Sequence, residues 1–194
     1  MQNSAMPRVL VFCGARDAGP AFTAAAFAFG EAVARRGWGV VYGGHHAGMM
    51  GAVADGCLVH GGAVTGILPD ELIGKEVPPA GIELVRVKDM HARKQAMVDR
   101  SDVIVALPGG YGTLDELFEQ LTWRVIGKHT KPIGVLDVSV AGVSYWQPML
   151  TFLDHATSTG FITSAARSLM VVHDDVEVLC EHLGLHRQPL LPAH

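Results

Sequence analysis

Positive charge is scarce in this sequence. Lysine and arginine together number 15 among 194 residues, against 19 aspartates and glutamates, and the formal net charge is −4. A chain with this balance has no overall attraction for nucleic acid or for an anionic membrane. We therefore expect neither as a partner, and any phosphate that the protein binds must be held by local groups.

Cysteines and long apolar runs are also few. Cys13, Cys57 and Cys180 are odd in number and far apart, which favours reduced thiols in a cytoplasmic protein over a disulfide framework. No apolar stretch approaches the roughly 20 residues of a membrane helix, and the run before Cys13 is too short for a signal peptide. We expect a single domain over residues 1–194, with a loose tail from about residue 185.

Glycine, by contrast, is abundant and follows short apolar runs. Three such pairs occur: Val9–Phe12 before Gly14, Gly39–Tyr42 before Gly43–Gly51, and Val103–Leu107 before Pro108–Gly112. Helix-like segments separate the runs, and this alternation predicts an α/β fold with a parallel sheet covered by helices on both faces. Because ligands bind beyond the carboxyl ends of such strands, we expect all three glycine turns along one ligand-binding edge.

The expected elements follow from the same patterns. Strands are predicted at 9–12, 39–42, 63–68, 82–87, 103–107, 133–136 and 168–172. Helices are predicted at 20–36, from the second glycine turn to about 60, and at 89–100, 113–126, 145–157 and 174–183.

The third glycine turn leads into a helix start. Three glycines within Pro108–Gly112 allow the backbone to approach a ligand closely. Thr113 and Glu116 then have the spacing of a capping box, in which Thr113 caps the helix and Glu116 reaches back to it. Free N–H groups and the helix dipole favour an anion at such a position, so the sequence predicts a phosphate site here.

Two motifs together identify a family resemblance. The segment Met90-His91-Ala92-Arg93-Lys94, followed by Pro-Gly-Gly-Tyr-Gly-Thr-Leu-Asp-Glu at 108–116, resembles the signature of the Lonely Guy (LOG) family. These proteins are cytokinin riboside 5′-monophosphate phosphoribohydrolases, formerly mislabelled as lysine decarboxylases. The resemblance implies a Rossmann-like, doubly wound fold, a homodimer, and hydrolysis of a nucleotide such as AMP or isopentenyl-AMP without a cofactor. Two departures stand in the first turn, where Ala15 and Arg16 occupy positions that are commonly serine.

The resemblance also implies particular site residues. Arg93 and Glu116 correspond to the catalytic pair of the family. The corresponding substrate-binding residues, besides that pair, are Glu76, Lys94, Gly109, Gly110, Tyr111, Gly112, Thr113 and Thr122. Each has a purely structural alternative: Glu116 as a helix cap, Arg93 as a solvated helix residue, Glu76 as a surface carboxylate, and Thr122 as an ordinary helix threonine.

Other functions fit the residues less well. His45, His46 and His60 invite a metal site, but no cysteine or carboxylate stands beside the first two at ligand spacing. A nicotinamide dehydrogenase would need G-x-G-x-x-G after the first strand, and Gly14 and Gly19 do not have that spacing. No lysine lies in a context typical of pyridoxal phosphate. The alternative that stays open is a non-catalytic nucleotide or molybdenum-cofactor carrier of the same fold.

Overall fold

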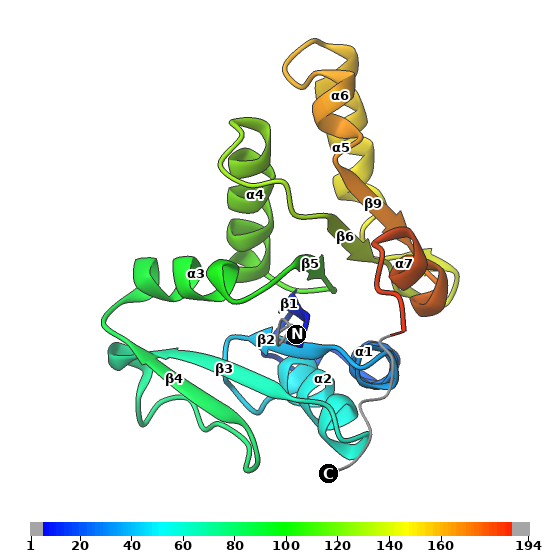
Figure 1. The fold of residues 1–194 in the computed structure, drawn as a ribbon. Helices are drawn as coiled ribbons and strands as arrows, with labels where there is room; N and C mark the ends of the chain where they lie inside the picture. The colour runs from blue at the N-terminus through cyan, green and yellow to red at the C-terminus, as the bar shows by residue number, and fades with distance from the viewer. Residues whose placement is uncertain (1–5, 188–194) are drawn as a thin grey trace.

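The centre of the molecule is a seven-stranded parallel sheet. Figure 1 shows the computed structural model, which describes residues 6–187. The strand order is β4-β3-β2-β1-β5-β6-β9, and every neighbouring pair is parallel. The strands are β1 (Arg8–Phe12), β2 (Gly39–Tyr42), β3 (Val64–Pro69), β4 (Glu83–Val87), β5 (Val103–Ala106), β6 (Ile133–Leu136) and β9 (Met170–His173).

Helices cover both faces of this sheet, as the alternating pattern predicts. The helices are α1 (Pro20–Arg35), α2 (Gly48–Val59), α3 (Met90–Asp99), α4 (Tyr111–Val125), α5 (Gln147–Ser158), α6 (Ser164–Arg167) and α7 (Val176–His182), with a short 3₁₀ turn η1 (Asp70–Leu72). Two separate hydrophobic clusters show the division: Val9 packs with α1, α2 and α7, whereas Leu10 packs with α3, α4 and α5. Successive residues of β1 thus point to opposite layers, and the layers lie on opposite sides of the sheet in Figure 1.

The order of the strands places a ligand site. The chain moves outward from β1 through β2 and β3 to β4, and then returns to the other side of β1 with β5. The reversal lies between β1 and β5, which is the topological switch point where doubly wound folds bind ligands. The first glycine turn follows β1 and the third follows β5, so these two turns flank the switch point.

One helix start differs from the prediction. The predicted capping box at Thr113 is wrong: α4 begins at Tyr111, its N-cap is Gly110, and no side chain of residues 6–187 caps it. Thr113 is instead 3% exposed and packs over Gly109, where an added Cβ would lie 2.1 Å from the threonine Oγ1. With Gly110 as the N-cap, Glu116 is the sixth residue of α4 rather than the third, so it does not have the position of a capping-box glutamate.

The remaining differences are small elements. The hairpin of β7 (Ser139–Val140) and β8 (Val143–Ser144) turns through Ala141 and Gly142, both with positive φ. An alanine rarely adopts that conformation, so the sequence did not indicate a turn there.

The tail was expected to be loose from about residue 185. Leu185 is 1% exposed, and residues 188–194 of that tail lie outside the described residues. Within residues 6–187, no helix is long and apolar enough to cross a membrane.

Candidate functional site

A cavity of about 700 Å³ lies where the glycine turns meet. All three predicted turns contribute to its lining, through Gly14, Gly43 and Pro108–Thr113. Backbone bonds tie the turns together: the Gly14 amide donates to the Pro108 carbonyl at 3.0 Å, and the Met49 amide at the start of α2 donates to the Gly14 carbonyl at 3.1 Å. The prediction that the three turns share one edge is therefore confirmed.

The start of α4 presents unpaired backbone donors to this cavity. The first amides of any helix lack acceptors within the helix, and in the part of the chain that the structure describes no side chain caps those of α4. The carbonyl of Gly109, just before these amides, accepts a hydrogen bond from the Tyr145 hydroxyl at 2.5 Å. Because the N–H groups and the helix dipole point toward the same space, this end of the cavity is suited to an anion such as a phosphate.

Arg93 is buried at the centre of the site. Its side chain, 7% exposed, donates from Nε to the Ile67 carbonyl at 3.1 Å and from Nη2 to the Gly43 carbonyl at 2.6 Å. A Cβ at Gly43 would lie 2.2 Å from Nη2, so the second turn needs glycine to admit the guanidinium. Arg93 therefore ties α3 to β3 and to the turn after β2 with two of its five N–H donors, and its Nη1 lies 3.7 Å from Met90 Sδ.

Glu76 lies against Arg93. The Arg93 Nη2 and Glu76 Oε2 are 3.7 Å apart, an ion pair without a close hydrogen bond. The Glu76 Oε2 is buried and has no hydrogen-bond partner among the described residues. A buried carboxylate oxygen without a donor is costly, so this atom is ready to accept a hydrogen bond from a ligand in the cavity.

Glu116 lines the same cavity one turn of α4 beyond the free amides. Burial raises the pKa of its carboxyl from 4.5 to about 7, against the opposing effect of the Arg93 charge. Its neighbour Cys13 lies at the end of β1, and burial likewise raises the pKa of that thiol above its ordinary value. The site thus contains a carboxyl group that titrates near neutral pH, which is a property of catalytic acids and bases.

Two of the predicted binding residues lie elsewhere. Lys94 turns away from the cavity toward α4, where its Nζ is 3.1 Å from Asp115 Oδ2 and 3.0 Å from Glu119 Oε1. The Thr122 hydroxyl donates to the Phe118 carbonyl at 2.8 Å, and the residue lines a different groove. The cavity does bring together Glu76, Arg93, Glu116 and the turn Gly109–Thr113.

Sequence reasoning missed two polar residues of the cavity lining, Arg16 and Tyr145. Tyr145 follows the unpredicted hairpin, so no motif pointed to it. The ring of Trp146 is 1% exposed and fixes this segment, because its Nε1 donates to the Leu136 carbonyl at 3.2 Å. Arg16 carried a signal, because it stands in a glycine turn after a strand at a position that is commonly serine in the resembled family.

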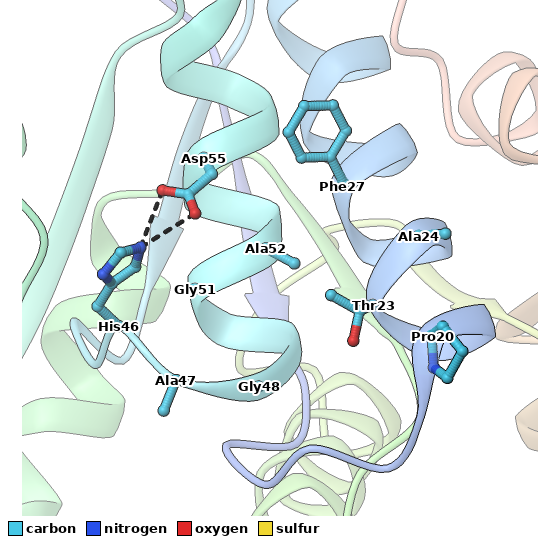
Figure 2. Close-up of a pocket in the computed structure, with 10 residues that line it drawn as sticks. All are labelled: Pro20, Thr23, Ala24, Phe27, His46, Ala47, Gly48, Gly51, Ala52 and Asp55. Atoms are coloured by element: carbon cyan, nitrogen blue, oxygen red, sulfur yellow. Dashed lines mark hydrogen bonds and ion pairs between the residues drawn. The ribbon is translucent and has the colours of Figure 1, made fainter.

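The histidines do not gather at one place. A second hollow, of about 550 Å³, is lined by residues of α1, of α2 and of the turn before α2. His46 Nε2 lies 2.9 Å from Asp55 Oδ1 there, and Figure 2 shows these two side chains facing each other. His60 pairs instead with Glu31 at 3.0 Å, and His45 Nδ1 accepts from the Val77 amide at 3.2 Å. Over residues 6–187, no three His, Cys, Asp or Glu side chains are grouped so that they could hold a metal ion.

Comparison with known proteins places this geometry in context. A family described as "Possible lysine decarboxylase" matches residues 50–183. The cytokinin riboside 5′-monophosphate phosphoribohydrolase of Rhodococcoides fascians is 41% identical over 174 residues, covering 87% of this chain and 85% of that protein. The Arabidopsis thaliana protein of the same name, LOG7, is 39% identical over 184 residues, covering 93% and 82%.

Solved structures show the same fold. The molybdenum cofactor binding protein from Rippkaea orientalis matches with a TM-score of 0.71 and 23% identity, over 93% of this chain and 96% of that one. The Moco carrier protein of Chlamydomonas reinhardtii matches with a TM-score of 0.68 and 22% identity, over 93% and 98%. At such identities the likeness is one of fold.

Proposed function

Because this chain belongs to the Lonely Guy family, whose curated relatives are named cytokinin riboside 5′-monophosphate phosphoribohydrolases, we propose that it hydrolyses the N-glycosidic bond of a nucleoside 5′-monophosphate. The proposed substrates are AMP and isopentenyl-AMP, and the products are the free base and ribose 5-phosphate. The observation that supports this most is the position of Glu116. Its carboxyl lines the cavity one helical turn from the amides that suit a phosphate.

The proposed reaction adds water across the bond between C1′ and the base nitrogen. The 5′-phosphate binds the amides at the start of α4, and the ribose extends toward Glu116. As the bond to the base breaks, positive charge develops at C1′, and the ionised Glu116 carboxylate stabilises it. The water oxygen bonds to C1′, and the proton that it loses passes through Glu116 to the departing base.

Glu76 and Arg93 have supporting roles in this proposal. The unpartnered oxygen of Glu76 accepts a hydrogen bond from a hydroxyl of the ribose or an amino group of the base. Arg93 holds that carboxylate and the second glycine turn in place. Its charge also favours ionisation of Glu116, since it lowers the pKa that burial raises.

A carrier function is the weaker alternative. The relatives named as phosphoribohydrolases are about 40% identical over most of the chain, whereas the carrier structures are 22–23% identical. A carrier would bind its ligand tightly without turnover and would not need Glu116.

Incubation of the purified protein with AMP and separation of the products by chromatography tests the proposal. We expect adenine and ribose 5-phosphate in equal amounts, and isopentenyl-AMP should release its base in the same way. Release of inorganic phosphate with adenosine would show that a different bond is cleaved. Retention of AMP without any product would favour the carrier.

The titration of Glu116 should be visible in the free protein. Because burial raises the pKa of this carboxyl to about 7, its ¹³C NMR signal should move with a midpoint near pH 7 rather than near 4.5. The active form is the carboxylate, so kcat/KM should rise from pH 5 to pH 8. A midpoint near 4.5, identified by the signal that is lost in Glu116→Gln, would contradict the proposed environment.

We further propose that the protein is a homodimer. Large apolar side chains are exposed along α4, α5 and the start of the α5–α6 connection, namely Phe118, Val125, Ile126, Phe152 and Phe161. Some of them border a groove of about 300 Å³ between α4 and the segment 161–170. An apolar surface of this kind is typical of an interface. We propose a second copy of the chain as the partner at this surface. Tyr111, at the start of α4, is 93% exposed and lines the cavity, so an interface along α4 would continue to the cavity.

Substitution of Phe161, which is 90% exposed, should separate the copies. In size-exclusion chromatography with light scattering, the variant Phe161→Asp should have a mass of about 21 kDa, and the unmodified protein should have twice that mass. The matched control is Val59→Asp, because Val59 is 71% exposed at the far end of α2. If the unmodified protein elutes as a monomer, the dimer is refuted.

We also propose a cytoplasmic location. The three cysteines are free thiols, which supports a reducing compartment.

A further inference from the structure

The charges around the cavity do not balance for a phosphorylated substrate. Glu76 and Glu116 both line it, and an AMP phosphate adds between one and two negative charges near neutral pH. The family resemblance implied substrate contacts by two cationic residues, Arg93 and Lys94. Arg93 donates instead to two backbone carbonyls and faces Glu76, and Lys94 pairs with two carboxylates on α4.

Arg16 is the other cationic residue of the cavity lining. Among the described residues that line it, Arg16 and Arg93 are the only lysines or arginines. The side chain of Arg16 is exposed and makes no hydrogen bond or ion pair with any residue of 6–187. Its guanidinium therefore retains all its donors for a ligand.

The backbone around Arg16 is fixed against both neighbouring turns. An added Cβ at Gly48, which has a φ of 52°, would lie 2.5 Å from the Arg16 carbonyl oxygen, so the start of α2 packs directly on this residue. Next to it, Gly14 approaches the third turn, where its ideal Cβ would be 3.4 Å from the Gly109 Cα. A side chain that leaves the chain here and lines the cavity is close to the turn that opens α4.

We propose that Arg16 binds the phosphate monoester of the substrate, opposite the amides at the start of α4. This inference rests on the proposed function, since it assigns a ligand group to the same cavity. A guanidinium can donate two parallel hydrogen bonds to phosphate oxygens, and such a charge-assisted pair is stronger than a neutral one. Arg16 would then supply the charge that distinguishes a nucleotide from a nucleoside.

The variants Arg16→Ala and Arg16→Lys test this role, with Arg86→Ala as the control. Arg86 has a side chain 64% exposed on β4, outside the cavity lining, so its loss changes the net charge equally. We expect Arg16→Ala to raise the KM for AMP about 10- to 100-fold with a much smaller change in kcat, as for a contact made in both ground and transition states. The preference for AMP over adenosine should fall by the same factor, and Arg16→Lys should restore part of it.

Calorimetry with ribose 5-phosphate separates this inference from the proposed function. Arg16→Ala should weaken its binding by the same factor, and Arg86→Ala should bind it like the unmodified protein. If the unmodified protein cleaves AMP but Arg16→Ala keeps its KM and its affinity for ribose 5-phosphate, the role of Arg16 is refuted and the function stands. If AMP is not cleaved but ribose 5-phosphate binds and depends on Arg16, the function is refuted and the phosphate contact stands. If AMP is not cleaved and ribose 5-phosphate does not bind, both are refuted.

Discussion

Replacement of Glu116 with glutamine should nearly abolish base release and, at the same time, stabilise the protein above neutral pH. Glutamine preserves the shape of the side chain but can neither carry the negative charge nor transfer a proton. We expect kcat to fall by about 10²- to 10⁴-fold, the range found when such a group is removed. Chromatographic measurement of adenine release from AMP gives this ratio.

The effect on stability follows from the pKa. Burial raises the pKa of the folded-state carboxyl from 4.5 to about 7, so the fold favours the protonated form. The stabilising contribution is fully present below pH 4.5 and is lost as the pH rises through about 7. Since each tenfold change in proton affinity is worth about 1.4 kcal/mol, urea unfolding should show Glu116→Gln more stable by up to about 3 kcal/mol at pH 8 and unchanged at pH 4.

A neighbouring carboxylate provides the control. Asp115 precedes Glu116 on α4, but its side chain is 64% exposed and pairs with Lys94. The variant Asp115→Asn should change kcat less than about threefold and the free energy of unfolding by less than about 1 kcal/mol. Retention of near-normal activity in Glu116→Gln, or a stability difference that does not depend on pH, would contradict the assignment of Glu116.

Replacement of Arg93 with alanine should abolish activity and also weaken the fold. The change leaves the Ile67 and Gly43 carbonyls without their donor and leaves the buried oxygen of Glu76 without a counter-charge. Removing one partner of a buried ion pair typically costs about 3–5 kcal/mol of the free energy of unfolding. Thermal and urea unfolding measure this loss, and adenine release measures the activity.

Two further variants separate the charge of Arg93 from its geometry. Arg93→Lys keeps the charge but cannot donate to both carbonyls as the planar fork does, so it should regain part of the stability and little of the activity. Arg100→Ala removes an exposed arginine just after α3 and should change the free energy of unfolding by no more than about 0.5 kcal/mol. Its activity should stay close to that of the unmodified protein. Full activity in Arg93→Ala would show that the second glycine turn and Glu76 do not need this anchor.

The sequence predicted most of the fold because its local signals agree with the global arrangement. The apolar run Val103–Leu107 and the glycines after it both indicate a buried strand that ends at a ligand site, and β5 has that position. The helix predicted at 89–100 begins with an aspartate, a residue type that favours helix starts, and the Asp89 side chain caps α3 by accepting from the Ala92 amide at 2.7 Å. The predicted start of α4 was wrong because a capping pattern takes account only of hydrogen bonds between neighbouring residues. In the folded protein Thr113 packs over Gly109 instead of capping the helix.

The motifs of the candidate site could be predicted from the sequence, but the directions in which their side chains point could not. Spacing along a helix does not reveal which way Lys94 turns, and only the three-dimensional position of Asp115 and Glu119 directs it away from the cavity. Arg93 was expected to contact the substrate, but its buried bonds to Ile67 and Gly43 join segments that are distant in the sequence. Such long-range contacts have no signature in a single sequence.

A crystal structure of Glu116→Gln with AMP bound tests the central proposal most directly. We expect the 5′-phosphate on the amides at the start of α4 with the Arg16 guanidinium beside it, and C1′ of the ribose facing the carboxamide of residue 116. AMP bound in the hollow between α1 and α2, or bound in the main cavity with C1′ directed away from residue 116, would contradict the proposed mechanism.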